Sequence, residues 1–253
     1  MELKDYLYYQ DDAGEIYCGD CLEIMPLLAD KAIDMILCDL PYGTTACHWD
    51  TIIPFEPLWK NYKRTIKDNG AIVLTASQPF TSALVMSNIK MFKYEWIWEK
   101  SLSGSPALCR KTPMKVHENV LVFGGKNYNP QMTKGTKRKK GISGSSIEGQ
   151  KFISSGINNG EINDDYYPRS VQYFSNADRK NKVHPTQKPV ALFEYLIKTY
   201  TNEGDLVLDN CAGSGTTGVA CKNTNRNFIL IEQDEKYCDI IKERVNCEVI
   251  KVL

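Results

Sequence analysis

The chain has 253 residues, which is enough for one large α/β domain with a small insertion. Its 31 basic and 31 acidic side chains cancel, so any surface that binds nucleic acid must be a local cluster of charge. Apolar residues make up 42% of the chain, yet no apolar run approaches the ~20 residues that cross a bilayer. Because residues 1–10 are too polar for a signal peptide, we expect a cytoplasmic protein with no membrane partner.

Nine cysteines are scattered along the chain, and we expect them to be reduced thiols that pack in the interior. Cys18 and Cys21 form a C-x-x-C pair, which in principle suits a redox pair or half of a zinc site. No second pair has ligand spacing and the chain has only three histidines, so we expect no bound metal. Cys38, which precedes Asp39, is likewise interpreted as a packing residue.

The N-terminal half alternates segments of strand and helix character. Residues 32–38 form a nearly continuous apolar run, interrupted by Asp34 and ending at Asp39, which is typical of a strand buried on both faces of a parallel sheet. The sequence also predicts strands at 15–19, 71–75, 94–98 and 118–123 and helices at 21–28, 55–67 and 79–88, with Asp68-Asn69-Gly70 ending the second helix. Trp96 and Trp98 alternate with Ile97, so their rings should face the same side of one strand.

Residues 126–183 differ from the rest, because glycine, serine, asparagine and lysine dominate and periodicity is weak. Order returns at His184. Beyond it the sequence predicts helices at 190–200, from 215, and at 235–246, and strands at 205–209 and 227–232. The repeated alternation of strand and helix predicts a doubly wound, Rossmann-like α/β sheet of about seven strands, with ligands at the carboxyl ends of its strands.

The strongest local motif runs from Asp209 to Gly218, where an apolar strand enters a turn of small residues that opens a helix. Glycines let a ligand approach the backbone, and the free amides of a helix start favour a negative group. Glu232 ends the next strand, where an acid can accept hydrogen bonds from both ribose hydroxyls of a nucleoside cofactor. Residues 213–218 also fit the dinucleotide pattern G-x-G-x-x-G literally, so a nicotinamide cofactor stays open at this point.

The tetrapeptide Asp39-Leu40-Pro41-Tyr42 directly follows a buried strand, where a doubly wound fold presents its active residues. A carboxylate and a neighbouring backbone carbonyl can accept the two N–H groups of an exocyclic amine and so orient its lone pair. Pro41 stiffens the turn, and Tyr42 offers a flat face for a base outside the duplex. Alone, the tetrapeptide fits a strand-ending turn equally well.

Together these motifs resemble those of the β-class DNA amino-methyltransferases over nearly the whole chain. Residues 39–42 are similar to the family's Asp-Pro-Pro-Tyr motif, residues 209–217 to its Asp-Pro-Phe-x-Gly-Ser-Gly-Thr-Thr motif, and residues 184–189 to its His-Pro-Thr-x-Lys-Pro segment. This circularly permuted order places the catalytic half first. It implies a catalytic half at 1–125, an inserted target-recognition region at 126–183 and a cofactor-binding half at 184–253.

The resemblance implies S-adenosyl-methionine as the cofactor. The residues it assigns to cofactor binding are Asp20, Cys21, Asp39, Thr186, Gln187, Lys188, Asp209, Cys211, Gly213, Ser214, Gly215, Thr216, Thr217 and Glu232. Two departures stand out. Leu40 replaces a proline, although its carbonyl can still be the second amine acceptor, and Asn210-Cys211 replace Pro-Phe, which removes an aromatic contact and should alter cofactor affinity.

The expected reaction is an in-line methyl transfer to the N6 amine of an adenine flipped out of DNA. Asp39 and the Leu40 carbonyl would orient the amine, and Tyr42 would stack the base. Aspartate at position 39 inclines the resemblance toward adenine, but N4 of cytosine has the same local geometry and stays open. A nicotinamide-dependent oxidoreductase, a cofactor-free DNA-binding module and an RNA substrate are more distant alternatives.

A basic cluster, Lys137, Arg138, Lys139 and Lys140, lies in the weakly periodic region. Such a run is either a solvated loop or a contact to DNA phosphates, and we favour the phosphate contact. Double-stranded DNA is the expected partner. The resemblance also suggests a cognate restriction endonuclease and a homodimer, for which the sequence contains no motif.

Overall fold

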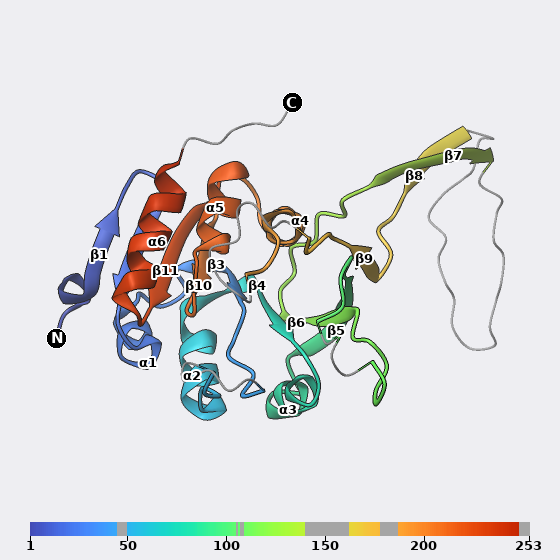
Figure 1. The fold of residues 1–253 in the computed structure, drawn as a ribbon. Helices are drawn as coiled ribbons and strands as arrows, with labels where there is room; N and C mark the ends of the chain where they lie inside the picture. The colour runs from blue at the N-terminus through green and yellow to red at the C-terminus, as the bar shows by residue number, and fades with distance from the viewer. Residues whose placement is uncertain (45–49, 105, 107–108, 140–161, 178–186, 248–253) are drawn as a thin grey trace. The chain divides into compact units, whose positions relative to one another are not determined.

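The computed structural model describes residues 1–44, 50–104, 106, 109–139, 162–177 and 187–247 (Figure 1). The chain divides into two compact units, one made of Met1–Asn129 with Ser170–Leu253 and the other of Pro130–Arg169. The first unit contains the tetrapeptide, residues 39–42, and the glycine-rich turn, residues 209–218. Among the described helices, none has both the length and the apolar content to span a lipid bilayer.

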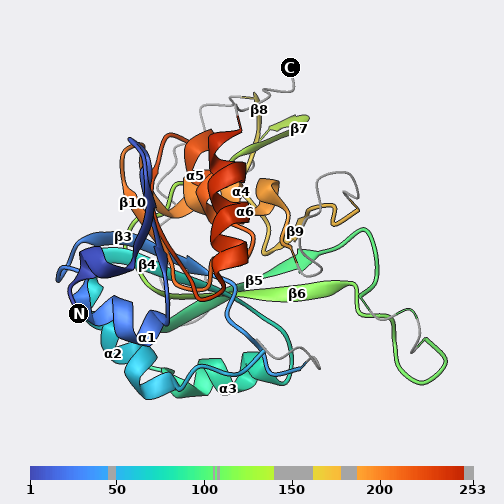
Figure 2. The same ribbon diagram turned by 60° about the vertical axis from the view of Figure 1, so that its left-hand side comes forward.

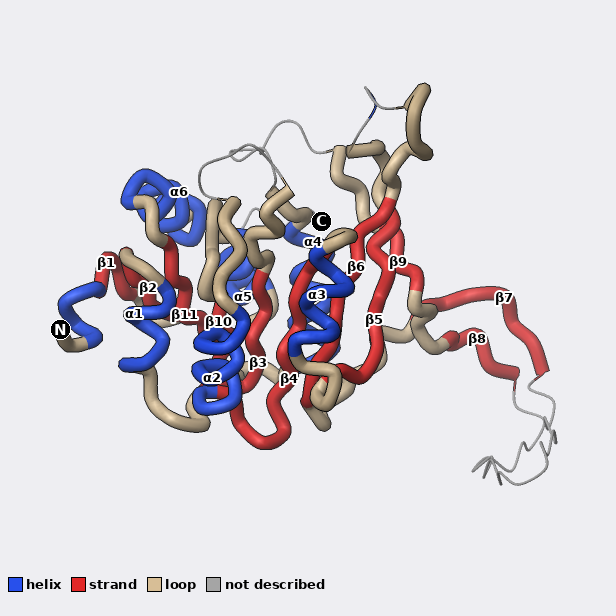
Figure 3. The backbone as a smooth tube through the Cα atoms, turned by 90° about the horizontal axis from the view of Figure 1, so that it is seen from below, coloured by secondary structure: helices blue, strands red, loops and turns tan. Residues whose placement is uncertain are grey.

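The first unit is built on a mixed sheet. Within the described residues nine strands form it, in the order β1-β2-β11-β10-β3-β4-β6-β5-β9 (Figure 3). Their bounds are β1 Leu7–Gln10, β2 Gly14–Cys18, β3 Ile33–Cys38, β4 Ile66–Ala76, β5 Phe92–Glu99, β6 His117–Gly124, β9 Val171–Tyr173, β10 Leu206–Asp209 and β11 Asn227–Glu232. The sequence predicted about seven strands. β1 and β9 account for the difference, because they are short edge strands with little periodicity to reveal them.

The middle of the sheet is parallel, and its winding reverses between β3 and β10. β2, β11, β10, β3 and β4 all run in the same direction. β6 runs antiparallel to β4, and β5 runs antiparallel to β6 and so has the direction of β4 again. The chain moves outward from β3 to β4 on one side and from β10 to β11 on the other. The carboxyl ends of β3 and β10 therefore flank the switch point at which open α/β sheets bind ligands.

Helices cover both faces of this sheet (Figures 1 and 2). Their bounds are α1 Cys21–Ile24, α2 Phe55–Thr65, α3 Phe80–Ser87, α4 Val190–Tyr200, α5 Thr216–Asn223 and α6 Glu235–Asn246, with short 3₁₀ turns at η1 Leu3–Tyr6 and η2 Met25–Leu27. Side chains alternate along β3: Met35 and Leu37 pack with α4, α5 and α6, whereas Ile36 and Cys38 pack with α1, α2 and α3. All six residues of β3 are buried, as the apolar run predicted.

One N-terminal expectation was wrong. The sequence predicted a helix to residue 67 ended by Asp68-Asn69-Gly70, but α2 ends at Thr65 and β4 begins at Ile66. Ile66 pairs with Ile33, and a register irregularity between Ile33 and Met35 accommodates the turn-forming residues within the strand. Trp96 and Trp98 are both buried against the same core, as predicted.

The described part of the second unit is an antiparallel pair, β7 Thr133–Lys139 and β8 Ile162–Tyr166. Lys134 on β7 pairs with Asp164 at 3.0 Å and with Asp165 at 2.7 Å. Of the basic cluster, Lys137 is exposed on β7, Arg138 and Lys139 complete this strand, and Lys140 lies outside the described residues. A region of weak periodicity thus contains a regular hairpin.

Asp34, the acid that interrupts the apolar run of β3, joins three strands. It is 8% exposed, and both its oxygens accept hydrogen bonds from Lys67 Nζ on β4 at 2.7 Å. Its Oδ2 also accepts from the backbone N–H of Leu206 at the start of β10, at 3.0 Å. The strand that carries the tetrapeptide is therefore tied to the strand that carries the glycine-rich turn.

We predict that Asp34→Ala lowers the free energy of unfolding by about 1–3 kcal/mol, because it leaves a buried amide and an ammonium without their acceptor. Urea unfolding followed by circular dichroism measures the change. Asp68→Ala is the control, since Asp68 is 85% exposed and pairs with Lys31 at the surface, where such a pair contributes less than about 1 kcal/mol. Equal losses in the two variants would contradict the role of Asp34.

Candidate active site

The tetrapeptide and the glycine-rich turn meet at one edge of the sheet. β3 and β10 are direct parallel neighbours, with Met35 opposite Val207 and Ile36 opposite Leu208. Asp39 follows the last residue of β3, and Asp209 is the last residue of β10. Residues far apart in the sequence are thus brought side by side at the switch point.

The Asp39 carboxylate is held by three donors from three parts of the fold. Its Oδ1 accepts hydrogen bonds from Tyr42 Oη, at 2.8 Å, and from the Thr75 hydroxyl on β4. Its Oδ2 accepts from Lys188 Nζ at 2.7 Å. A carboxylate can accept about four hydrogen bonds, so among the described residues one acceptor position on Oδ2 has no donor.

Lys188, just before α4, is the cation of this site. It is 7% exposed, and its Nζ lies 2.7 Å from Asp39 Oδ2, 3.4 Å from Glu118 Oε2 and 5.4 Å from the centre of the Tyr42 ring. Burial lowers the pKa of Lys188, but the two carboxylates outweigh this effect and raise that pKa above its ordinary value. The side chain is therefore a buried ammonium.

The turn after Tyr42 is fixed by backbone hydrogen bonds to a buried acid. The oxygens of Asp50, which is 8% exposed, accept from the N–H groups of Gly43 at 2.8 Å and Thr44 at 2.9 Å. Gly43 has a φ of +65°, and a Cβ there would lie 2.9 Å from the Ile52 side chain. This position therefore requires glycine, and the chain turns away sharply beyond the tetrapeptide.

Leu40 and Tyr42 contribute to packing as well as to the site. Leu40, which departs from the family's proline, is 3% exposed and lies in the core beneath α1, α2 and α3. The Tyr42 ring stacks on Phe80, with 5.3 Å between centroids and 25° between planes. Burial raises the pKa of Tyr42 well above its ordinary value, so its hydroxyl keeps the proton that it donates to Asp39.

Asp209 organises the glycine-rich turn. It is 2% exposed, its Oδ1 accepts from the N–H of Cys211 at 3.1 Å, and its Oδ2 accepts from the Thr217 hydroxyl on α5. Burial raises the pKa of Asp209 from 3.8 to about 6, although these donors lower it. Through these two hydrogen bonds, the side chain of Asp209 connects the turn to α5.

Asn210-Cys211, the other departure from the family motif, has its own partners. The Asn210 side-chain oxygen accepts a buried hydrogen bond of 2.5 Å from Tyr62 on α2. The thiol of Cys211 contacts those of Cys21 and Cys38, while Cys18 contacts Cys238. The two cysteines of the C-x-x-C pair thus face different partners, and the described cysteines are free thiols.

Glu232 closes the turn from the neighbouring strand β11. Its Oε2 accepts from the N–H of Gly213 at 2.7 Å, and its Oε1 accepts from the N–H groups of Gln233 at 2.9 Å and Asp234 at 3.0 Å. Burial raises the pKa of Glu232, whereas these amides lower it. Asp20, at the end of β2, caps α1 through Leu22 N–H at 2.7 Å. β2 pairs with β11, so both acids stand on one edge.

Gly213 and Gly215 of the turn differ in what surrounds them. Gly213 has a φ of +52°, and a Cβ there would meet open space in the described structure. Gly215, with a φ of +77°, leads into α5, and a Cβ there would lie 2.8 Å from Ile241. Gly215 is thus required by helix packing, whereas the space beside Gly213 is open to a ligand.

Other residues assigned by the resemblance hold the loop in place. Ser214 accepts from Arg244 through its carbonyl and, at 3.0 Å, its hydroxyl. The buried Thr216 hydroxyl lies 3.5 Å from the Lys188 carbonyl, which links the turn to the segment before α4. Gln187 is half-buried, and Thr186 lies outside the described residues.

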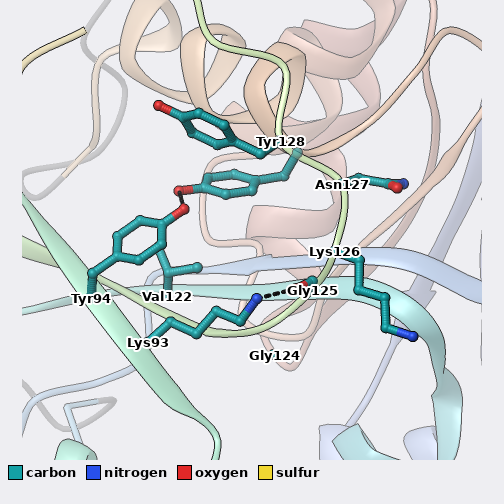
Figure 4. Close-up of a pocket in the computed structure, with 9 residues that line it drawn as sticks. Lys93, Tyr94, Val122, Gly124, Gly125, Lys126, Asn127 and Tyr128 are labelled. Carbon is teal, nitrogen blue, oxygen red and sulfur yellow. Dashed lines mark hydrogen bonds between the residues drawn. The ribbon is translucent and has the colours of Figure 1, made fainter. Parts of the chain in front are cut away.

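A separate cavity of about 310 Å³ lies at the opposite edge of the sheet, where β5 begins and β6 ends (Figure 4). Tyr94, Tyr128 and Tyr200 line it with Lys93 and Lys126. Gly124, at the end of β6, also lines it, and β6 runs antiparallel to β4. Because the carboxyl end of β4 leads to the Asp39 site, this cavity is remote from the tetrapeptide.

The sequence did not point to Thr75, Phe80 or Glu118. Thr75 ends the predicted strand beside the tetrapeptide, so its place at a carboxyl end was an available signal. Glu118 opens β6, and nothing local shows that this strand runs antiparallel and brings its first residues to the same edge. Phe80 opens α3, where an aromatic residue normally indicates core packing.

The comparisons with known proteins identify the family of the chain. Residues 33–243 match the profile of the DNA methylase family N6_N4_Mtase, so the chain belongs to that family. Among curated relatives, Type II methyltransferase M.HpaI of Haemophilus parainfluenzae is 29% identical over 92% of this chain and 74% of its own length. Type II methyltransferase M2.MboI of Moraxella bovis is 28% identical over 100% of this chain and 94% of its own.

Solved structures share the fold. The M1.HpyAVI–SAM complex is 27% identical with a TM-score of 0.63, covering 92% of this chain and 99% of that chain. The PvuII DNA methyltransferase, cytosine-N4-specific, has a TM-score of 0.65 over 94% of each chain. At 18% identity the second likeness shows the fold alone. The expected α/β methyltransferase fold is therefore confirmed.

We predict that Asp209 makes stability depend on pH. Its folded-state pKa of about 6 exceeds the ordinary 3.8, so between these values the folded chain binds more protons than the unfolded chain. The free energy of unfolding of the wild type, relative to Asp209→Asn, should fall from about pH 4 to about pH 6 and stay level above it. Urea titrations of both proteins across this range provide the measurement, and a constant difference would contradict the burial effect.

Proposed function

We propose that this chain transfers a methyl group from S-adenosyl-methionine to the N6 amine of an adenine in DNA. The observation that carries the proposal is that Asp39 lies at the same edge of the sheet as the glycine-rich turn and Glu232, because β3 and β10 are neighbours. Asp39 can accept hydrogen bonds from an amine, and the turn with Glu232 suits a nucleoside whose hydroxyls donate. Membership of the DNA methylase family supports this chemistry over a nicotinamide-dependent oxidoreductase, which would share only the glycine pattern.

The turn has the donor and acceptor groups that the cofactor requires. The space beside Gly213 admits a ligand against the backbone, and Glu232 and Asp20 offer carboxylates on the same edge. Glu232 would accept from the ribose hydroxyls, and Asp20 from the adenine amine. S-adenosyl-methionine supplies an electrophilic methyl group on a sulfonium sulfur. The relative named as a complex with SAM, M1.HpyAVI, supports this assignment.

Asp39 orients the attacking amine. One N–H donates to the remaining acceptor position on Oδ2, and the other donates to the Leu40 carbonyl, which aims the nitrogen lone pair at the methyl group. Tyr42 and Thr75 hold Oδ1, so the carboxylate is preorganised before the base arrives. Asp39 would also stabilise the positive charge that develops on the nitrogen while the bond between the methyl group and the sulfonium sulfur breaks and the sulfur keeps the electron pair, and the methylated ammonium would then shed its proton to water.

The target base stacks beside Tyr42 after leaving the duplex. Flipping costs a few kcal/mol, of which stacking on an aromatic ring offsets about 1–3 kcal/mol. Phe80 already stacks on this ring, so the base would share Tyr42 with Phe80 and Lys188. N4 of cytosine presents the same amine geometry and is the alternative. The presence of aspartate at position 39 supports adenine.

Double-stranded DNA is the proposed substrate, and two basic segments are available to hold its phosphates. The first is the cluster Lys137, Arg138, Lys139 and Lys140. The second is residues 100–116, between β5 and β6, which contain Lys100, Arg110, Lys111 and Lys115 and no acid. This segment leaves the sheet at the edge that carries Glu118 and Asp39, and Arg110 and Lys111 are exposed. Its position supports a phosphate contact beside the active site.

The relatives' designation as Type II methyltransferases supports a role in restriction–modification. A cognate restriction endonuclease, a homodimer, cytoplasmic localisation and the division into halves at 1–125 and 184–253 around a target-recognition region at 126–183 stay predictions. The compact unit Pro130–Arg169 lies within that predicted region and supports its assignment.

We predict that Asp39→Ala abolishes methyl transfer and keeps most cofactor binding, because the variant loses the amine acceptor but none of the turn. The assay incubates protein with DNA and labelled S-adenosyl-methionine, digests the DNA to nucleosides and identifies the methylated one. N6-methyladenosine is the expected product of the wild type, whereas N4-methylcytosine would favour the alternative. Turnover of Asp39→Ala above a few per cent would overturn the role of Asp39.

For the DNA contact, we predict that glutamine at Arg110 and Lys111, or at all four residues 137–140, weakens binding to every DNA sequence and flattens its salt dependence. Each lost phosphate contact should reduce the slope of log K against log salt concentration by about 0.9. Fluorescence anisotropy at several salt concentrations measures the slope. Glutamine at the exposed Lys60 and Lys63 of α2 is the charge-matched control for the double variant. A cluster whose loss leaves the slope unchanged does not touch DNA.

A further inference from the structure

Four charged side chains form a row that ends at the proposed active site. Lys100 Nζ pairs with Glu118 Oε1, Glu118 Oε2 lies 3.4 Å from Lys188 Nζ, and Lys188 Nζ contacts Asp39 Oδ2 at 2.7 Å. Three of the four members are largely withdrawn from water: the side chains of Lys100, Glu118 and Lys188 are 10%, 13% and 8% exposed. Charges alternate in sign along the row. Only its end at Asp39 belongs to the tetrapeptide.

The ammonium of Lys188 creates a difficulty for the reaction. Positive charge develops on the attacking amine, and Asp39 must stabilise it there. A lysine that stays 2.7 Å from the same carboxylate occupies one acceptor position of Oδ2 next to the amine and offsets the negative charge that the amine needs. Lys188 therefore has to give up part of its contact with Asp39 when the base is bound.

Glu118 offers Lys188 a second acceptor at very short range. Glu118 Oε2 is buried and accepts no hydrogen bond from the part of the chain that the structure describes. Lys100 holds the other oxygen, and Glu118 stands on β6, between β4 and β5. A small shift of the ammonium along the 3.4 Å gap would complete a hydrogen bond to Oε2 and release Asp39 Oδ2.

We propose that Glu118 is a positioning residue that draws Lys188 away from Asp39 when the target amine binds. This inference rests on the proposed function, because it gives Asp39 the task of receiving the amine. The Glu118 charge keeps the ammonium compensated in both positions, so moving it does not leave a buried unpaired cation. Lys188 thus keeps the carboxylate ordered before the base arrives, and Glu118 frees the carboxylate afterwards.

Glu118→Gln tests the proposal with little change in shape. The amide oxygen can still accept from Lys100, but the negative charge facing Lys188 is lost. We expect the single-turnover rate of methyl transfer to fall by about tenfold or more, with the dissociation constants for S-adenosyl-methionine and DNA changed by less than about twofold. Glu118→Asp keeps the charge and should recover part of the rate. Glu99→Gln, an exposed acid at the end of the neighbouring strand β5, is the matched control and should keep the wild-type rate.

A double-mutant cycle separates positioning from simple structural support. In a Lys188→Met background, Glu118→Gln should change the rate by less than about twofold, because Glu118 acts through the ammonium. If Lys188→Met leaves no measurable turnover, Lys188→Arg supplies the background, and the loss there should again be smaller than in the wild type. Equal losses from Glu118→Gln in both backgrounds, or a wild-type rate in Glu118→Gln alone, would overturn the proposal. Circular dichroism checks that each variant is folded. If Glu118→Gln does not fold, Glu118→Asp takes its place in the comparison.

Failure of the inference and failure of the proposed function give different results. If Asp39→Ala is inactive and Glu118→Gln behaves like the wild type, only the role of Glu118 is wrong. If Asp39→Ala keeps its activity, the proposed role of Asp39 is wrong, and the role of Glu118 falls with it.

Discussion

The parallel pairing of β3 with β10 is the constraint on which the rest of the structure depends. These two strands come from the N-terminal and C-terminal parts of the chain, and their parallel pairing brings Asp39, which follows β3, to the same edge of the sheet as Asp209, the last residue of β10. Asp34 reinforces the pairing at the other end of the strands, where its carboxylate accepts from Lys67 and from the Leu206 backbone. Without this pairing, the tetrapeptide and the glycine-rich turn would be two ordinary strand-ending turns.

Residues that depart from the family motifs are tied into the structure around them. Leu40 fills the core beneath the helices where the family has proline, and Asn210 accepts a buried hydrogen bond from Tyr62. Cys211 contacts the thiols of Cys21 and Cys38. The lost aromatic contact is thus accompanied by polar and thiol contacts that attach the glycine-rich turn to α2, α1 and β3.

Strong local patterns made much of the fold predictable. The bounds of α4, β11 and α6 agree with the sequence prediction, because each has clear periodicity and β11 and α6 end at sharp polar boundaries. Residues 66–70 were predicted wrongly, since turn-forming residues inside a strand require a pairing irregularity that only the neighbouring strand reveals. Glu118 and Thr75 were missed for a related reason. A side chain joins a site through strand order and direction, and these depend on contacts between distant residues.

The antiparallel direction of β6 separates two kinds of surface on the same sheet. Its first residues arrive at the edge of Asp39, and its last residues leave at the opposite edge beside Tyr94 and Tyr200. The segment that joins β5 to β6 therefore leaves the sheet next to the candidate active site, and the two strands that hold its ends pair with each other. Insertions and deletions in that segment can remodel what stands beside the candidate active site without shifting any strand. The fold thus separates a segment that can vary in length and sequence from the strands that hold Asp39 and Asp209 in place.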